Sequence, residues 1–238
     1  MMREQFTKKI IGVWAIAVLV LCNLNASFAQ KTPTAEEQAN YTKVITDRAD
    51  KIVKVLNITD SAKYKRVRAI IVDQYRNLST IHDGRNAEVA QLNEQKKVAD
   101  ADKAALNAKI AAIDTARVQK LAVLHKTYLS QLGKELTSAQ IDQVKDEMTF
   151  KILEVTYTAY LDELPQLTDV QKKQIMDWLV EAREIAIDAE SSNKKHDVFG
   201  KYKGRINNYL SKQGYDMKKA GEEWQARIKE REAAKQKN

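Results

Sequence analysis

The sequence predicts an all-α protein, a multi-helix bundle that contains a long antiparallel helical hairpin. Only two prolines and seven glycines occur among its 238 residues, so few positions would break a helix. After residue 29, strong helix formers such as Ala, Lys, Gln, Glu and Leu dominate. The period-two alternation typical of strands is hard to find there, which favours helices throughout.

The first 29 residues resemble a signal peptide. A basic start precedes a short apolar run, with Arg3, Lys8 and Lys9 before Ile10–Cys22. The small residues Ser27 and Ala29 predict cleavage before Gln30. The run is shorter than the roughly 20 apolar residues of a transmembrane helix, so an uncleaved anchor is the less favoured alternative. We therefore expect a periplasmic or secreted mature chain, residues 30–238, without a transmembrane segment.

The cysteine count and the net charge limit the chemistry of the mature chain. Cys22 is the only cysteine, and Leu21 stands where a lipoprotein signal has a small residue. Complete removal of the segment leaves neither disulfides nor thiolate metal sites. The net charge falls from +8 to +6, because the segment carries three basic residues and one acidic residue. Export argues against nucleic acid as a partner, whereas an anionic glycan or a membrane surface is compatible with this charge.

Capping residues and apolar stripes predict the first three helices. Thr34–Glu37 is a capping box that starts a helix running to about Leu56. A long helix follows the turn at Asn57–Asp60, and the chain reverses near Val98–Asp102. A second long helix should end with Gly133 as the residue just after it. One continuous helix through the reversal is the alternative to a hairpin.

Similar signals divide the rest of the chain. Capping boxes at Thr137 and Thr168 start two helices, the second reaching about Ala189. Between the two boxes, β-branched and aromatic residues predict a kink or an irregular stretch within Thr149–Tyr160. The remaining features are a loop at Ser191–Lys195, a helix ending near Gly214, and a last helix capped by Asp216 whose tail, Glu230–Asn238, frays. Since no linker is evident, residues 30–238 are interpreted as a single helical domain.

The segment His196–Leu210 has the richest combination of polar residues. On a helix, one sector holds two glycines four residues apart together with His196, Lys203 and Asn207. Glycines leave room for a close neighbour, and a cation, an imidazole and an amide suit an anionic or hydroxylated ligand. Tight helix–helix packing with Lys203 extended to solvent is the alternative.

Further candidates lie on other helices. Arg183 falls within an apolar arc, so it must face a cleft or form a buried ion pair. The acidic residues of the same helix are expected on the solvated side: Glu181, Glu184 and Asp188. In Ile81–Arg85, Gly84 indicates a kink or a close approach, and His82 and Arg85 join the candidate ligand site; a solvated kink is the alternative. Two further candidates, Tyr157 and Tyr160, could stack on a ligand, and His125 is interpreted as a partly buried structural histidine.

No catalytic or metal-binding pattern is present in the sequence. The three histidines offer no ligand pair at helical spacing, and no nucleophile elbow, phosphate loop or zinc motif occurs. We therefore predict no metal and no cofactor, and the sequence assigns no catalytic residue.

Two resemblances accompany these patterns. The pentads Leu136–Gln140 and Leu167–Gln171 resemble the LTxxQ motifs of small periplasmic stress chaperones, although their spacing is short for that family. Five longer segments are similar to an exported bacterial family, domain of unknown function 3826: Arg48–Asp60, Asp73–Arg85, Val155–Ile175, Trp178–Ser192 and Phe199–Trp224. This second resemblance implies an exported helical domain in bacteria that degrade complex glycans, and it supplies no catalytic residues.

Three hypotheses for the function follow. The first is a binding or accessory protein for an anionic or hydroxylated glycan. The second is an enzyme on acidic polysaccharides, in which Arg183 and Lys203 neutralise a carboxylate of the substrate and His196 or a tyrosine transfers the proton. The third is a periplasmic chaperone or stress adaptor of the LTxxQ type.

Overall fold

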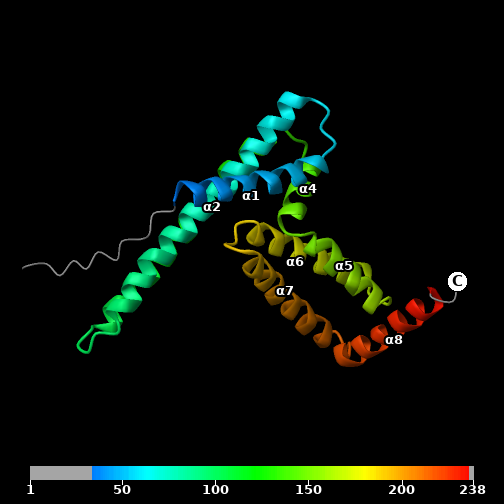
Figure 1. Cartoon of the computed structure of the whole chain (residues 1–238). Helices are drawn as coiled ribbons and strands as arrows, with labels where there is room; N and C mark the ends of the chain where they lie inside the picture. Colours follow the sequence, from blue (N-terminus) through cyan, green and yellow to red (C-terminus); the bar gives the residue numbers. More distant parts are fainter. Residues whose placement is uncertain (1–33, 236–238) are drawn as a thin grey trace, which may run out of the picture. The chain divides into compact units, whose positions relative to one another are not determined.

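The computed structural model describes residues 34–235, and within this range the chain forms eight helices and no strand (Figure 1). The predicted all-α class is confirmed. The signal peptide predicted at residues 1–29 lies outside the described residues. Among residues 34–235, no helix combines the length and the apolar character needed to cross a bilayer.

The helices begin where their capping residues predict. The predicted capping boxes at Thr34, Thr137 and Thr168 start α1 (Ala35–Lys54), α4 (Ser138–Met148) and α6 (Asp169–Ala186), and in each both reciprocal hydrogen bonds are present. Two donors of the first turn are thereby satisfied at each helix start.

The predicted hairpin is confirmed. The helices α2 (Ser61–Gln95) and α3 (Lys103–Gly133) pack along each other, and the chain reverses between them at residues 96–102 (Figure 1). The alternative of one continuous helix is therefore wrong.

The predicted role of Gly133 is wrong. It is the last residue of α3, is followed by a right-handed cap at Lys134, and does not have a positive φ. The glycine that ends a helix in the left-handed region is Gly214, with φ of +95°, after α7. Gly214 therefore occupies a left-handed backbone position that favours glycine, whereas Gly133 occupies a helical position that other residues also adopt.

Substitution of these two glycines should have opposite effects on stability. Gly133→Ala should raise the free energy of unfolding by about 0.5–1 kcal/mol, because alanine favours the helix and a Cβ there meets no atom within 4 Å. Gly214→Ala should lower it, because alanine is strained at that φ. Urea denaturation measures both, and a loss of stability in Gly133→Ala would contradict the assignment.

Two other boundaries differ from the prediction. Between α4 and α5 (Ile152–Glu163), only residues 149–151 are irregular, with Phe150 and Lys151 at φ of 57° and 55°. The predicted loop at residues 191–195 is instead the start of α7 (Ser192–Lys212), because Ser191 accepts a hydrogen bond from the Lys194 amide. The last helix, α8 (Met217–Lys235), continues through residues that were expected to fray.

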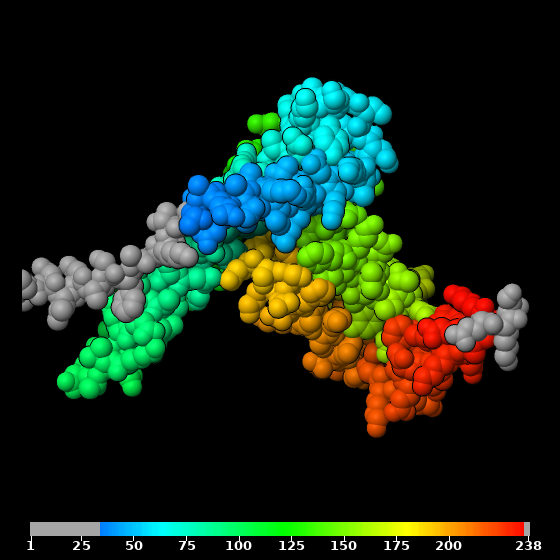
Figure 2. All heavy atoms as spheres, in the orientation of Figure 1, coloured from blue at the N-terminus to red at the C-terminus, as the bar shows by residue number. Residues whose placement is uncertain are grey.

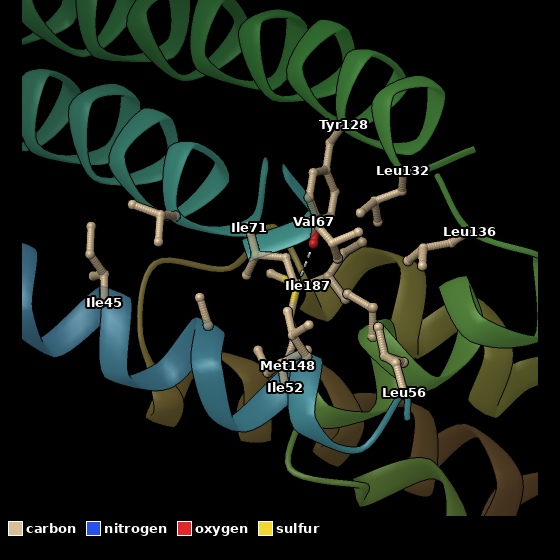
Figure 3. Close-up of a cluster of buried hydrophobic side chains, with 14 residues drawn as sticks. Ile45, Ile52, Leu56, Val67, Ile71, Tyr128, Leu132, Leu136, Met148 and Ile187 are labelled. Carbon is tan, nitrogen blue, oxygen red and sulfur yellow. Dashed lines mark hydrogen bonds between the residues drawn. The ribbon is translucent and has the colours of Figure 1, made fainter. Parts of the chain in front are cut away.

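Buried apolar side chains form two clusters. The first joins α1, α2, α3 and α4, and its fourteen buried residues are drawn in Figure 3. In this cluster the Tyr128 hydroxyl donates to Met148 Sδ at 3.2 Å. The second lies among α5, α6 and α7, with partly buried residues of α8 against it. The end of α6 joins them, since Ala186 belongs to the second cluster and Ile187 to the first. The single-domain interpretation of residues 30–238 stays a prediction.

Candidate functional site

Arg183 forms a buried ion pair. Its side chain is 7% exposed, and its Nη1 and Nη2 donate to Asp146 and Asp142 of α4 at 2.7 and 2.6 Å. Burial acts to lower the pKa of Arg183, but the hydrogen bond and the surrounding carboxylates raise it overall. The structure thus places Arg183 in the ion pair that the sequence left open as an alternative. Its predicted role in ligand binding is not supported by this pairing.

The charges continue from Arg183 along α6. The ammonium of buried Lys145 donates to Glu184 at 2.9 Å, and the other oxygen of Glu184 lies 3.7 Å from His125 Nε2. Glu184 and Asp188 are 30% and 13% exposed. The predicted place on a solvated side is confirmed for Glu181, which is 53% exposed, but is wrong for Glu184 and Asp188. His125 of α3 contacts both of these carboxylates, and Lys145 of α4 contacts Glu184.

Asp188, just after α6, connects this chain of charges to the hairpin. Its backbone carbonyl accepts from His82 Nε2 at 2.8 Å, and its carboxylate accepts from His125 Nδ1 at 2.7 Å and Gln74 Nε2 at 3.4 Å. We call Gln74, His82, His125, Lys145, Glu184 and Asp188 the Asp188 network. His82 and Arg183, two of the predicted site residues, are therefore linked through this network rather than facing a common opening.

The Asp188 network holds a titratable histidine and lies close to a buried lysine. The hydrogen bond to Asp188 raises the pKa of His125, although burial opposes this. Lys195 donates to the Met148 carbonyl at 2.8 Å, and burial lowers its pKa to about 8. Sequence reasoning missed Lys195 because residues 191–195 were assigned to a loop; on a helix it lies one turn before buried Phe199, on the core side. We interpret the network as the structural joint between the hairpin and the rest of the protein.

Three other predicted residues lie on α7 and are exposed. His196 is exposed and stacks on Phe150, with ring centroids 6.1 Å apart and planes within 1°. Lys203 is also exposed, and Asn207 accepts a hydrogen bond from the Tyr160 hydroxyl at 2.6 Å. In the described part of the chain none of these three residues forms a hydrogen bond or an ion pair with Arg183. Ligand binding by them stays a prediction.

The glycines and tyrosines near these residues differ from expectation. A Cβ at Gly200 or Gly204 would meet no atom within 4 Å, so the alternative of tight helix packing there is wrong. Tyr160 is 5% exposed, so its buried ring offers no face for a ligand. Tyr157 is half-buried against the second apolar cluster. The sector of α7 with the two glycines is therefore an open surface rather than a packed notch.

A separate hollow lies between the two helices of the hairpin. It has a volume of about 320 Å³ and is bordered by Gly84, Arg85 and Glu88 of α2 and by Arg117 and Lys120 of α3. A Cβ at Gly84 would meet no atom within 4 Å. Although Gly84 was expected to mark a kink or close approach, α2 stays helical through it and its missing side chain leaves this space open. We call this space the Gly84 hollow.

The Gly84 hollow presents positive charge. Arg85 donates to both oxygens of Asp114, at 2.8 and 3.1 Å; this bidentate bond raises the pKa of Arg85 and lowers that of Asp114. Arg117 Nε is 3.7 Å from the same carboxylate, too far for a hydrogen bond, and is buried without an acceptor within residues 34–235. Lys120 has no ion-pair partner in this range. Glu88 is the single acidic residue on the wall.

Arg117 could have been found from the sequence. It lies four residues after Ile113 and four before Leu121, so it interrupts the apolar stripe of its helix just as Arg183 does. A charge in that position must find a partner or face an opening. No group of histidines, cysteines or carboxylates that could hold a metal occurs among the described residues.

The comparisons with known proteins give a family and no function. No curated protein matches the chain. The family model described as "Protein of unknown function (DUF3826)" matches residues 42–230, which include α2 to α7 entirely and most of α1 and α8. This match agrees with the resemblance found in the sequence. The LTxxQ resemblance is not addressed by these comparisons. The chain belongs to the DUF3826 family.

Proposed function

We propose that this protein is an exported binding or accessory protein whose Gly84 hollow takes an anionic unit of a glycan. The observation that carries the proposal is the buried Nε–H of Arg117, which lacks an acceptor within residues 34–235 and belongs to a side chain that borders the hollow together with Lys120. A buried donor without a partner costs about 1–3 kcal/mol. A carboxylate or sulfate oxygen would satisfy it through a charge-assisted hydrogen bond.

The size and charge of the hollow fit such a ligand. About 320 Å³ is at the lower end of small-molecule sites and is sufficient for one sugar residue. Asp114 already neutralises Arg85, so the remaining charges on the wall of the hollow are the positive charges of Arg117 and Lys120 and the negative charge of Glu88. The glycan part of the proposal rests on the family resemblance, which implies bacteria that degrade complex glycans.

The arrangement favours binding over catalysis on an acidic polysaccharide. The enzyme hypothesis needs Arg183 to neutralise a substrate carboxylate, but Asp142 and Asp146 already hold its guanidinium. His196, its proposed proton carrier, stacks on Phe150 instead.

Calorimetric titration with trigalacturonic acid and a chondroitin sulfate tetrasaccharide tests the proposal. We expect at least one of them to bind, and Arg117→Ala and Lys120→Ala each to weaken that binding about tenfold or more, since hydrogen bonds to charged groups contribute about 1.5–3 kcal/mol. Added salt should also weaken binding to the wild type, because the side chains of Arg117 and Lys120 are partly solvated and their charges are screened.

A glycine substitution separates binding from folding. Gly84→Leu should fill the hollow and abolish binding while stabilising α2, because glycine is unfavourable in a helix interior. Gly200→Leu is the matched control: it is also a helical glycine with open space, but on α7, and should bind like the wild type. The proposal is wrong if neither acidic sugar binds, or if the Arg117, Lys120 and Gly84 variants all bind as the wild type does.

A further inference from the structure

A second opening lies where α8 packs against α5, as the adjacent atoms of the two helices in Figure 2 show. It is an open groove of about 620 Å³, bordered by Glu163 of α5 and by Lys218, Gly221, Trp224 and Lys229 of α8, among others. We call it the Trp224 groove. None of the ligand residues predicted from the sequence borders it.

The indole of Trp224 is held in one orientation. Its Nε1 donates to the carboxylate of Asp162 at 2.7 Å, and Arg231 donates to both oxygens of the same carboxylate, at 2.6 and 3.0 Å. These hydrogen bonds lower the pKa of Asp162 to about 2. Arg227 donates to the backbone carbonyls of Asp162 and Glu163 at the end of α5. The indole N–H is thus satisfied by Asp162, and Trp224 borders the groove.

The carboxylate of Glu163 has no hydrogen-bond or ion-pair partner in the described part of the chain, although the charge of Arg227 acts to lower its pKa. Partial burial outweighs this effect and raises the pKa of Glu163. A Cβ at Gly221 would lie 3.6 Å from Glu163 Oε1, so the glycine leaves this oxygen uncovered on that side. A half-buried carboxylate that lacks donors is stabilised by any ligand that brings them.

We propose that the Trp224 groove binds a neutral sugar residue, with Glu163 accepting hydrogen bonds from its hydroxyls and the Trp224 ring against its C–H face. Lys218, Gln225 and Lys229 border the groove and supply further donors to ring and hydroxyl oxygens. The two acidic residues on its wall, Glu163 and Glu222, balance the two lysines. A neutral sugar therefore fits better than the anionic unit proposed for the Gly84 hollow, and this inference does not depend on that hollow.

The test is a titration of the purified protein with maltohexaose, cellohexaose, xylohexaose and mannohexaose, followed by calorimetry and by the indole N–H signals in NMR spectra. We expect one or more of these sugars to bind and to shift the Trp224 indole signal, while the Trp178 signal does not move. Trp224→Ala and Glu163→Gln should each lower the affinity at least tenfold.

Further variants distinguish a loss of binding in the Trp224 groove from a loosening of α8. Glu163→Gln is isosteric and leaves the anchoring of α8 by Asp162 intact, so it retains its meaning if Trp224→Ala loosens that helix. Glu154→Gln changes an exposed carboxylate of the same helix and should bind normally, as should Arg117→Ala. The inference is overturned if none of the four sugars binds, or if binding survives both Trp224→Ala and Glu163→Gln. Loss of acidic-sugar binding in Arg117→Ala concerns the Gly84 hollow and does not bear on the Trp224 groove.

Discussion

Replacing Arg183 with alanine is expected to lower the free energy of unfolding by about 3 kcal/mol. The substitution leaves two carboxylates, Asp142 and Asp146, without the guanidinium that both contact at less than 2.8 Å. Breaking a buried ion pair typically costs about 3–5 kcal/mol. The lower end is expected because Asp142 is 53% exposed and regains water in the variant. Removal of the methylene groups of Arg183 adds to the loss.

Urea denaturation with an exposed control measures this effect. Arg76→Ala removes an arginine whose side chain is 47% exposed and whose partner, Asp73, lies on the same helix. Such surface pairs contribute about 0–1 kcal/mol. If Arg183→Ala and Arg76→Ala lower the free energy of unfolding equally, the ion pair between α4 and α6 does not stabilise the fold.

The contribution of Lys195 to the free energy of unfolding of the wild type should increase as the pH rises from about 8 to 10. The pKa of Lys195 is about 8 in the folded protein against 10.5 ordinarily. Between these values the unfolded chain binds more protons than the folded protein, so the free energy of unfolding rises with pH. A difference of this size corresponds to about 3 kcal/mol over the whole interval. Below pH 8 the ammonium is charged in both states, and its burial opposes folding in full.

Comparison with Lys195→Met isolates this component. The difference in unfolding free energy between the wild type and the variant should change by about 2 kcal/mol from pH 8 to 10, while contributions from other groups, including His125, largely cancel. Lys194→Met, which changes the exposed neighbour, should show no such change. A pH-independent difference for Lys195→Met would mean that the buried amine does not titrate in this range.

The order of the helices could be predicted because the signals that define them are local. A capping box needs only four consecutive residues, and those at Thr34, Thr137 and Thr168 each start a helix. Glycine is more ambiguous: Gly133 and Gly214 both end apolar stripes, but only Gly214 has the left-handed φ that a helix-ending glycine provides. Composition alone does not distinguish the two positions.

The site was less predictable because it depends on contacts between helices. On its own helix α4, Asp142 looks like a solvated residue, and only the packing of α6 makes it the partner of Arg183. Glu184 was misplaced for the same reason. Arg85 does border a hollow, and the position of Arg117 was available from helical spacing. The Trp224 groove could not be predicted, since it depends on how α8 lies against α5.

The most direct test of the proposed binding site is the NMR signal of the Arg117 Nε–H during titration with trigalacturonic acid and with the chondroitin sulfate tetrasaccharide. Arg183 provides an internal control, because within residues 34–235 its Nε is the other buried side-chain nitrogen that lacks an acceptor. We predict a saturable downfield shift of the Arg117 signal with at least one of these sugars and no shift of the Arg183 signal. An Arg117 signal that does not move at saturating concentrations of either sugar would contradict the assignment of the Gly84 hollow as an anion-binding site.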